Sequence, residues 1–286
     1  MISDDRAFVL LKRRIYTDRG LDCEQYKENY LKRRISVRLR ATGAGGYLDY
    51  LNTLKKDPDE YTKLLNELTV NVTQFFRDRD VYGKLREVVI PAIAEAKKTL
   101  HSRTLRVWSA GCSSGEEPYS VAILANEALG SEAPRWNVRV VGSDYDDKSL
   151  AVARAGSYRG LELPPEIDAE RYFVIKENKE GLEYKVRGEM RARVRFEKAN
   201  LLEYGARRHF DLVLCRNVLI YFEREVQAKI IKTLVGSVLG EGYLVLGKSE
   251  TTGPEVSKVL KQVFPAERIY KVIPGERPSA RGGKNG

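Results

Sequence analysis

The sequence predicts an α/β fold, a doubly wound parallel sheet, preceded by a small all-α domain. Three observations lead to this prediction. The first hundred residues carry apolar side chains at helical spacing. From Leu105 onward, short apolar runs alternate with helical segments, as in a parallel sheet covered by helices. Residues 106–119 have the pattern of a strand, a tight glycine turn and a helix, the unit that brings backbone close to a nucleotide-like ligand.

Four helices are predicted before residue 70. The first covers residues 4–16, where Phe8, Leu11 and Ile15 recur at helical spacing. Asp22 is expected to cap the second, which runs to about Thr42 before a glycine-rich break. Two shorter helices follow, with predicted ranges 47–54 and 58–68, and Asp57 and Pro58 are expected to cap the second of them.

Six cations lie on the second helix between Lys27 and Arg40. A charged helix face is most often simply solvated. The alternative is a docking face for an acidic helical partner, to which Lys27, Arg34 and Arg38 would contribute.

The segment after these helices breaks their periodicity with β-branched and polar residues. Asn71, Thr73 and Arg77 flank two adjacent phenylalanines. The phenylalanines predict a linker that packs into a core, and the polar groups predict the rim of a site. A helix ending near Leu100 follows, with Pro91 in its path.

Strands and helices then alternate. The expected strands are 105–110, 137–142, 210–215, 242–247 and 267–272, and the expected helices are 116–129, 148–155, 223–239 and 257–263. Between about 160 and 197 three polar–apolar runs predict a small antiparallel β-subdomain whose last strand rejoins the main sheet. The predicted organisation is a helical domain at 1–70, a linker and connecting helix at 71–103, an α/β domain at 104–273 and a disordered tail at 274–286.

Composition excludes several classes of protein. Three cysteines without a C-x-x-C and only two histidines argue against a disulfide framework, a structural zinc site and a Ser-His-Asp hydrolase, so no metal site is expected. No apolar run is long enough to span a bilayer and no signal region opens the chain, so a cytoplasmic protein is expected. The net charge of +10 favours an acidic partner without identifying it.

Polar residues follow three of the predicted strands, and ligands of open α/β sheets bind at these strand ends. Glu116 and Glu117 come directly after the glycine turn, Asp144 ends the second strand, and Arg216 and Asn217 follow a later one. An acid at the end of the second strand is placed to bind a ribose diol.

The glycine turn favours S-adenosylmethionine (SAM) over a dinucleotide. Gly111-Cys-Ser-Ser-Gly115 lacks the third glycine and the spacing of the NAD fingerprint. Two carboxylates after the turn would repel a pyrophosphate, whereas they suit the amine and sulfonium cations of SAM.

Five motifs together resemble the chemotaxis receptor glutamate methyltransferase family, CheR-type, over nearly the whole chain. They are LTVNVTQFFR at 68–77, VWSAGCSSGEEPYSV at 107–121, SDYD at 143–146, CRNVLIYF at 215–222 and GKSE at 247–250. The resemblance implies an all-α N-terminal domain and a Rossmann-like SAM-dependent methyltransferase domain with an antiparallel β-subdomain. It also implies methylation of receptor glutamate side chains to methyl esters, with S-adenosylhomocysteine (SAH) as the product of the cofactor.

By position, the resemblance implies a set of site residues. The implied cofactor-binding residues are Asn71, Thr73, Arg77, Gly111, Glu116, Glu117, Asp144, Asn200, Leu201, Arg216 and Asn217. Of the acidic pair, Glu117 is slightly favoured. Tyr221 matches a tyrosine near the transferring methyl group. The implied partner is the acidic helical methylation region of a receptor, bound by the basic helix, and the protein is expected to be a monomer.

The chemistry agrees with this resemblance. A glutamate carboxylate has an ordinary pKa of about 4.3 and is already ionised at neutral pH, so no general base is required. Catalysis then depends on alignment, for which Arg77 and Tyr221 are the expected positioning groups. Two alternatives stay open. One is an RNA or other nucleic-acid methyltransferase, although no Asn/Asp-Pro-Pro-aromatic segment stands at 216–221, and the other is a non-catalytic SAM-binding regulator.

Overall fold

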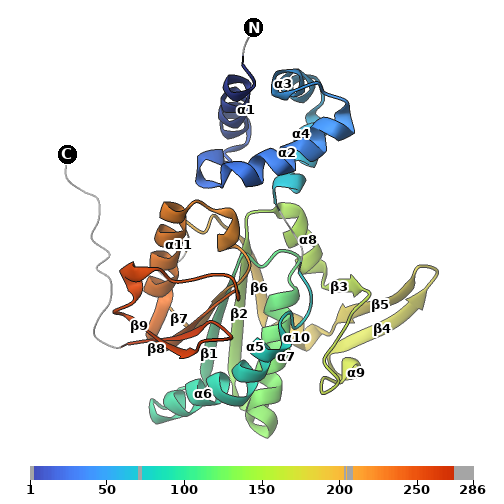
Figure 1. Cartoon of the computed structure of the whole chain (residues 1–286). Helices are drawn as coiled ribbons and strands as arrows, with labels where there is room; N and C mark the ends of the chain where they lie inside the picture. The colour runs from blue at the N-terminus through green and yellow to red at the C-terminus, as the bar shows by residue number, and fades with distance from the viewer. Residues whose placement is uncertain (1–2, 70–72, 203, 205–208, 274–286) are drawn as a thin grey trace. The chain divides into compact units, whose positions relative to one another are not determined.

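The computed structural model describes residues 3–69, 73–202, 204 and 209–273 (Figure 1). Asn71 and the tail at 274–286 therefore lie outside the described residues. The chain divides into two compact units: the N-terminal helices together with Tyr221–Gln227, and the chain formed by Asn71–Ile220 and the part from Ala228 onward. The predicted fold class is confirmed, because a helical unit is joined to a sheet flanked by helices and to a small antiparallel sheet.

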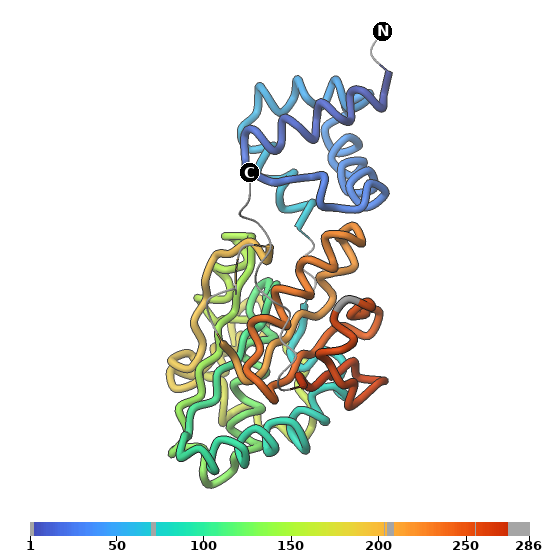
Figure 2. The backbone as a smooth tube through the Cα atoms, turned by 90° about the vertical axis from the view of Figure 1, so that its left-hand side faces the viewer, coloured from blue at the N-terminus to red at the C-terminus, as the bar shows by residue number. Residues whose placement is uncertain are grey.

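The helical unit is built from four α-helices, which are drawn in blue in Figure 2. They are α1 (Asp4–Arg19), α2 (Glu28–Thr42), α3 (Tyr47–Lys56) and α4 (Pro58–Leu68), with a short 3₁₀ turn at Cys23–Gln25. Leu11, Ile15, Ile35 and Leu64 are fully buried between them. Leu11 and Ile15 in α1, and the buried Leu31 and Ile35 in α2, are each four residues apart, the spacing that places apolar side chains on one face of a helix.

Two helix caps were predicted, and one was wrong. Asp57 does cap α4, since its side chain accepts hydrogen bonds from the backbone N–H groups of Asp59 and Glu60. Asp22 instead caps the short turn at Cys23–Gln25, where its Oδ1 accepts from the Glu24 N–H. The chain is extended at Tyr26, so α2 cannot begin before Glu28.

A distant segment, Tyr221–Gln227, completes the helical unit. The Lys27 N–H donates to the Tyr221 carbonyl and the Glu223 N–H donates to the Gln25 carbonyl, both at 3.0 Å. The Tyr221 ring lies 4.9 Å from the Tyr30 ring, measured between centroids. A stretch some 150 positions further along the chain is therefore part of the N-terminal fold.

The main sheet has seven strands in the order β6-β2-β1-β7-β8-β10-β9. Their bounds are β1 (Thr104–Ala110), β2 (Asn137–Asp144), β6 (Val194–Lys198), β7 (Phe210–Cys215), β8 (Val238–Leu246), β9 (Leu260–Phe264) and β10 (Ile269–Val272). The first five strands in that order are mutually parallel, as predicted. However, β10 runs antiparallel to both β8 and β9, so the sheet is mixed.

The helix predicted at 257–263 was wrong. Residues from Leu260 to Phe264 form β9, which pairs with β10 along its length. Val259, Leu260 and Val263 have helical spacing, but the run is too short for periodicity to separate helix from strand. Pairing with an otherwise open sheet edge decides between them.

Both faces of the sheet are covered, because all six residues of β7 are buried. The covering helices are α5 (Arg79–Lys84), α6 (Ile90–Thr99), α7 (Glu116–Leu129), α8 (Asp147–Ala155) and α11 (Arg224–Ser237), and Figure 1 shows their order along the sheet. A π-helical turn at Leu85–Val89 joins α5 to α6, with the Ile90 N–H bonded to the Leu85 carbonyl. This wider turn precedes Pro91, which cannot donate a helical hydrogen bond.

The predicted antiparallel insertion is present as a three-stranded sheet in the order β3-β5-β4. Its elements are β3 (Ser157–Arg159), α9 (Ala169–Tyr172), β4 (Phe173–Asn178), β5 (Gly181–Val186) and α10 (Gly188–Arg191). The following strand, β6, leaves this sheet and pairs parallel to β2, as expected. β3 was not predicted, because three residues are too few to show alternation.

Among the described helices, none combines the length and the apolar character needed to cross a bilayer.

Candidate functional site

The polar residues that follow three predicted strands come together at one edge of the sheet. β2, β1 and β7 are adjacent, and all three are parallel. Their carboxyl ends therefore bring together the glycine turn after Ala110, Asp144 at the end of β2, and Arg216 and Asn217 after β7. Only a parallel arrangement gathers these three segments, which lie up to a hundred residues apart.

The glycines of the turn are required by packing. Gly111 and Gly115 both have positive φ, at 77° and 95°. A Cβ on Gly111 would lie 2.6 Å from the Val218 side chain, and one on Gly115 would lie 2.7 Å from the Ala153 Cβ. The sequence led us to expect that this turn approaches a ligand. The structure adds a second requirement for glycine, because neighbouring side chains of the protein leave no room for a Cβ.

Asp144 is oriented by the backbone of two loops. Its Oδ2 accepts from the Ser113 N–H at 2.7 Å and its Oδ1 from the Asp146 N–H at 3.0 Å. Burial raises the pKa of Asp144, while these backbone bonds lower it. Each carboxylate oxygen keeps a further lone pair, so the group can still accept hydrogen bonds from a diol.

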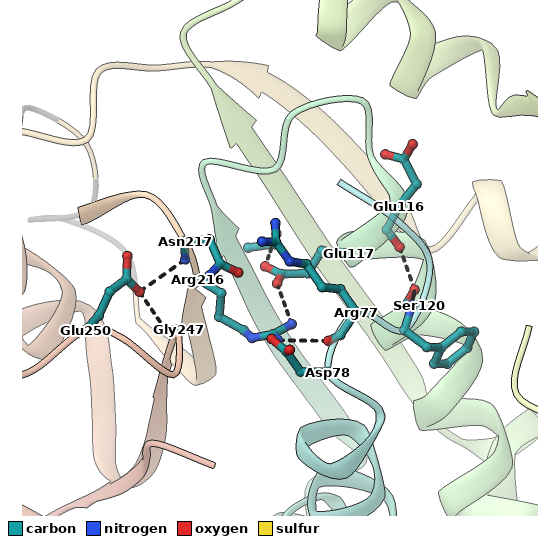
Figure 3. A network of polar contacts seen from close by, with 11 residues as sticks. Arg77, Asp78, Glu116, Glu117, Ser120, Arg216, Asn217, Gly247 and Glu250 are labelled. Carbon is teal, nitrogen blue, oxygen red and sulfur yellow. Dashed lines mark hydrogen bonds and ion pairs between the residues drawn. The ribbon is translucent and has the colours of Figure 1, made fainter. Parts of the chain in front are cut away.

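Glu116 and Glu117 have different surroundings. Glu116 accepts from the Ser114 hydroxyl at 2.8 Å, beside the turn itself. Glu117 accepts from the Ser109 hydroxyl at 2.8 Å and pairs with Arg216 at 3.3 Å. Figure 3 shows the Glu116 carboxylate pointing away from Arg77 and Arg216, whereas Glu117 points toward them. Burial raises the pKa of both carboxyls, and for Glu117 the charges of Arg216 and Arg77 oppose the effect of burial.

Arg216 joins the strand end to the linker. Its side chain is only 2% exposed. One guanidinium nitrogen pairs with Glu117, while the other donates to the Arg77 carbonyl at 2.8 Å and to Asp78 Oδ2 at 2.6 Å (Figure 3). Burial alone would lower the pKa of Arg216, but the neighbouring tyrosine and carboxylates keep it raised. The Arg216 guanidinium therefore stays charged between Glu117 and Asp78.

The linker is anchored by its two phenylalanines, as predicted. Phe75 makes edge contacts with Tyr158 and Phe173, and the Phe76 N–H donates to the Ser120 hydroxyl. Phe76 and Asp78 adopt left-handed backbone angles, with φ of 51° and 61°, which are unusual for non-glycine residues. This fixed bend lets the Arg77 carbonyl face Arg216. Of the two implied linker residues before it, Thr73 is half-buried and Asn71 lies outside the described residues.

Asn217 is held by a carboxylate that the sequence reasoning missed. Its backbone is left-handed, with φ of 61°, and its N–H donates to Glu250 Oε2 at 3.1 Å. Glu250 also accepts from the N–H groups of Gly247, Val218 and Leu219. The only sequence signal for this role was a lone acid in the GKSE motif, four residues after a strand.

The remaining implied residues follow β6, next to Asp144, or belong to the other unit; the Ala199 N–H, just before Asn200, donates to the Asp144 carbonyl at 2.9 Å. Asn200 follows β6, and its Oδ1 accepts from the Leu202 N–H, while Leu201 is 9% exposed. Tyr221 belongs to the helical unit, where it contacts Tyr30.

Several buried polar atoms around the strand ends have no partner within the described protein. They are Ser113 Oγ in the glycine turn, Asn217 Oδ1, Arg216 Nε and Tyr82 Oη. Burying such groups unpaired is costly, so their clustering here fits a polar ligand with both donors and acceptors. SAM is such a ligand, since it carries an amine, a carboxylate and a ribose diol.

The cysteines near the strand ends do not provide a reactive thiolate. Burial raises the pKa of Cys112 and Cys215 well above the ordinary thiol value, so both stay protonated. No group of three or more His, Cys, Asp or Glu side chains arranged to hold a metal ion occurs in the parts of the chain that the structure covers.

Comparison with known proteins gives consistent matches. The family model "CheR methyltransferase, SAM binding domain" matches residues 71–268, and "CheR methyltransferase, all-alpha domain" matches residues 6–69. Chemotaxis protein methyltransferase 2 of Pseudomonas aeruginosa is 34% identical over 85% of this chain and 85% of its own length. The chemotaxis protein methyltransferases of Salmonella typhimurium and Borreliella burgdorferi are 36% and 28% identical, over 86% and 93% of this chain and 84% and 94% of their own lengths.

Proposed function

Because the chain belongs to the CheR methyltransferase family and its cofactor is SAM, we propose that it methylates glutamate side-chain carboxylates of chemotaxis receptors, forming methyl esters. The observation that supports this proposal is the cluster of Arg77, Glu117 and the buried Arg216 beside Asp144 at the carboxyl ends of β1, β2 and β7. It combines a ribose acceptor, a carboxylate for a cationic ligand and one cation, Arg77, for a carboxylate substrate, since Arg216 is engaged by Glu117 and Asp78.

The cofactor would be held from three sides of this edge. Asp144 accepts from the ribose hydroxyls, and we assign the amino group to Glu117, because its carboxylate points toward Arg77 and Arg216 at the strand ends, whereas that of Glu116 points away from them. Ser113 Oγ and Asn217 Oδ1 supply further polar contacts, because both are buried without a protein partner. Asn71, Thr73, Asn200 and Leu201 are retained as contacts on the grounds of resemblance alone.

The reaction needs neither an acid nor a base from the protein. SAM supplies an electrophilic methyl group and departs as a neutral thioether. We assign alignment of the substrate carboxylate, and exclusion of water from it, to Arg77; Tyr221 keeps a role in alignment on the grounds of resemblance alone. In model systems such alignment contributes roughly 7–11 kcal/mol to lowering the barrier. A very tight Arg77–carboxylate contact would slow transfer, because it would stabilise the nucleophile more than the transition state.

The residues of α2 that we propose to contact the receptor differ from those expected from the sequence. Arg38 forms a two-pronged ion pair with Glu60, at 2.9 and 2.8 Å, and Arg34 pairs with Glu67 at 3.0 Å. These two arginines hold α2 against α4. Arg33 and Arg40 are exposed instead, so we assign the contact with an acidic receptor helix to them, together with Lys27.

The test is transfer of a labelled methyl group from SAM. The full chain is incubated with membranes carrying chemotaxis receptors and, separately, with total RNA. We expect label in the receptor that mild base releases, as it does from methyl esters, and no label when the receptor's candidate glutamates are replaced by alanine. Label in RNA would favour the nucleic-acid alternative. Tight SAH binding with no transfer to any acceptor would favour a non-catalytic regulator.

A further inference from the structure

Glu250 lies in the turn that follows β8 and is only 3% exposed. Its two carboxylate oxygens accept four backbone hydrogen bonds. Oε1 accepts from Val218 at 2.8 Å and Leu219 at 2.7 Å, and Oε2 accepts from Gly247 at 2.6 Å and Asn217 at 3.1 Å. Burial raises the pKa of this carboxyl, and the four N–H groups oppose that effect. A carboxylate surrounded by N–H donors is favoured over any neutral side chain.

These bonds join two neighbouring strand ends. β7 and β8 are parallel neighbours, with Cys215 opposite Leu246, and both leave the sheet at this level. Three of the four donors belong to the segment just after β7, and the fourth belongs to Gly247 just after β8. Asn217 has a left-handed backbone, which few residues adopt unaided, so these bonds stabilise an otherwise unfavourable conformation.

The segment that Glu250 holds carries one of the buried polar atoms that have no partner within the described protein. Asn217 Oδ1 is buried without a partner, and the preceding Arg216 bridges Glu117 and Asp78. Figure 3 shows Glu250 behind Asn217, on the side away from Glu117. Shifting the backbone at residue 217 would therefore displace both side chains that face the proposed cofactor. Val218 would move as well, and its side chain packs against Gly111 of the glycine turn.

We propose that Glu250 is a positioning residue for the cofactor: its carboxylate fixes the backbone after β7 so that Asn217 and Arg216 are already oriented before SAM binds. This inference rests on the proposed function, and it adds a residue that touches neither cofactor nor substrate. Gly247 is part of the same device. A Cβ there would lie 2.7 Å from both the Asn217 nitrogen and Glu250 Oε2, so only glycine leaves room for the bonds.

Two variants test the proposal by different physical routes. Glu250→Gln keeps the shape but turns an NH₂ group toward two of the four N–H donors. Gly247→Ala keeps the charge but places a methyl group in the bonded region. For both we expect SAH affinity, measured by calorimetry on the full chain, to fall about 10- to 100-fold, the range found when a residue supporting a binding group is lost. KM for SAM should rise while KM for the receptor stays unchanged.

Matched controls separate positioning from stability. Asp211 is equally buried, accepts from the Arg106 N–H and pairs with Lys97, but it lies near the opposite end of β7. Asp211→Asn should lower the melting temperature yet leave the SAH Kd within about twofold of wild type, as expected for a site distant from the binding groups. Gly236→Ala in α11 meets nothing within 4 Å, so it should leave the SAH Kd unchanged while raising the melting temperature slightly, because alanine favours the helix.

The outcomes are distinct. If wild type fails to bind SAH, the proposed function fails and the positioning role falls with it. If wild type binds and both variants bind within twofold of it, only the positioning role fails. If neither variant folds, amide hydrogen exchange on ligand-free wild type provides the test. Slow exchange at Asn217, Val218 and Leu219 supports the positioning role of Glu250, and exchange at the rate of an exposed loop overturns it.

Discussion

Each unit of the molecule contains an arginine–glutamate pair with one buried member, Glu60 in the helical unit and Arg216 in the α/β unit, and the two pairs differ in how completely their polar atoms are hydrogen-bonded. In the helical unit Glu60 is bound by both prongs of Arg38 and by the Tyr50 hydroxyl, and no polar side-chain atom of these three is buried without a partner. In the α/β unit Arg216 bridges Glu117 and Asp78, yet Arg216 Nε and nearby Asn217 Oδ1 remain unpaired. A closed network serves the fold, whereas an open one leaves groups available to a ligand.

The largest expected effect comes from removing the two arginines separately. Arg216→Ala and Arg38→Ala each leave a buried carboxylate uncompensated, so each should lower the free energy of unfolding by about 3–5 kcal/mol. Only Arg216→Ala should abolish SAH binding, while Arg38→Ala should bind SAH as wild type does. Chemical denaturation and calorimetry measure the two quantities. Equal loss of SAH binding in both variants would remove the distinction between the closed and the open network.

Arg77→Ala should have the next largest effect, because Arg77 is the cation of the open network that we assign to the substrate. Loss of a hydrogen bond to a charged group is worth about 1.5–3 kcal/mol, which corresponds to roughly a 10- to 150-fold lower transfer rate. Stability should change little, since the Arg216 bond is to the Arg77 backbone carbonyl. The transfer rate is measured with saturating receptor and SAM. A rate equal to wild type would make the assignment wrong.

The two glutamates should also respond differently to pH. Burial raises the pKa of Glu117 above 4.5, so its stabilising effect on the ligand-free fold is present below pH 4.5 and is lost as pH rises through the raised pKa. A ligand amine favours the ionised form, so SAH affinity should increase with pH across that same window. Calorimetry between pH 5 and 8 measures this, and Glu117→Gln should flatten the profile.

Glu60 provides the control for this titration. Burial raises its pKa, but the hydrogen bonds from Arg38 and Tyr50 outweigh burial and the net pKa lies below 4.5. Its stabilising effect is therefore present above pH 4.5 and is lost only as pH falls further. Glu60→Gln should leave the pH dependence of SAH affinity unchanged. A flattened profile in this variant would contradict the proposed separation of the two networks.

The smallest effect is expected for Tyr221→Phe. The ring contact with Tyr30 is retained, so stability should change by less than about 0.5 kcal/mol. If the hydroxyl aligns the reacting groups, transfer should slow about tenfold, as for loss of one modest hydrogen bond. Full transfer rates in both Tyr221→Phe and Arg77→Ala would leave catalysis without either of its proposed positioning groups.

Local patterns were enough to predict most of the elements and their order. The strand, turn and helix around Gly111–Gly115 and the five parallel strands follow from short-range periodicity, which the sequence displays directly. The errors occur where distant partners decide. β9 became a strand because β10 pairs with it, and β10 runs antiparallel because it folds back onto β8.

In the candidate site, too, local features could be predicted and contacts between distant residues could not. The sequence indicated which residues follow the strand ends, because this requires only the strand boundaries. It could not indicate that Arg38 is occupied by Glu60, 22 positions away, or that Glu250 holds a segment more than 30 positions earlier. It also could not indicate that Val218 and Ala153 leave no room for a Cβ at Gly111 and Gly115. Such pairings arise only once the chain has folded.

The segment Tyr221–Gln227 has a consequence for exchanging parts between relatives. The helical unit is discontinuous in sequence, since this heptapeptide supplies backbone hydrogen bonds to Gln25 and Lys27 and rings against Tyr26 and Tyr30. A chimera joined at residue 70 would combine one parent's helices with the other parent's heptapeptide. Grafts that transfer 1–70 and 221–227 together keep the two parts matched, so we expect the helical unit to fold in a chimera only when both segments come from the same parent.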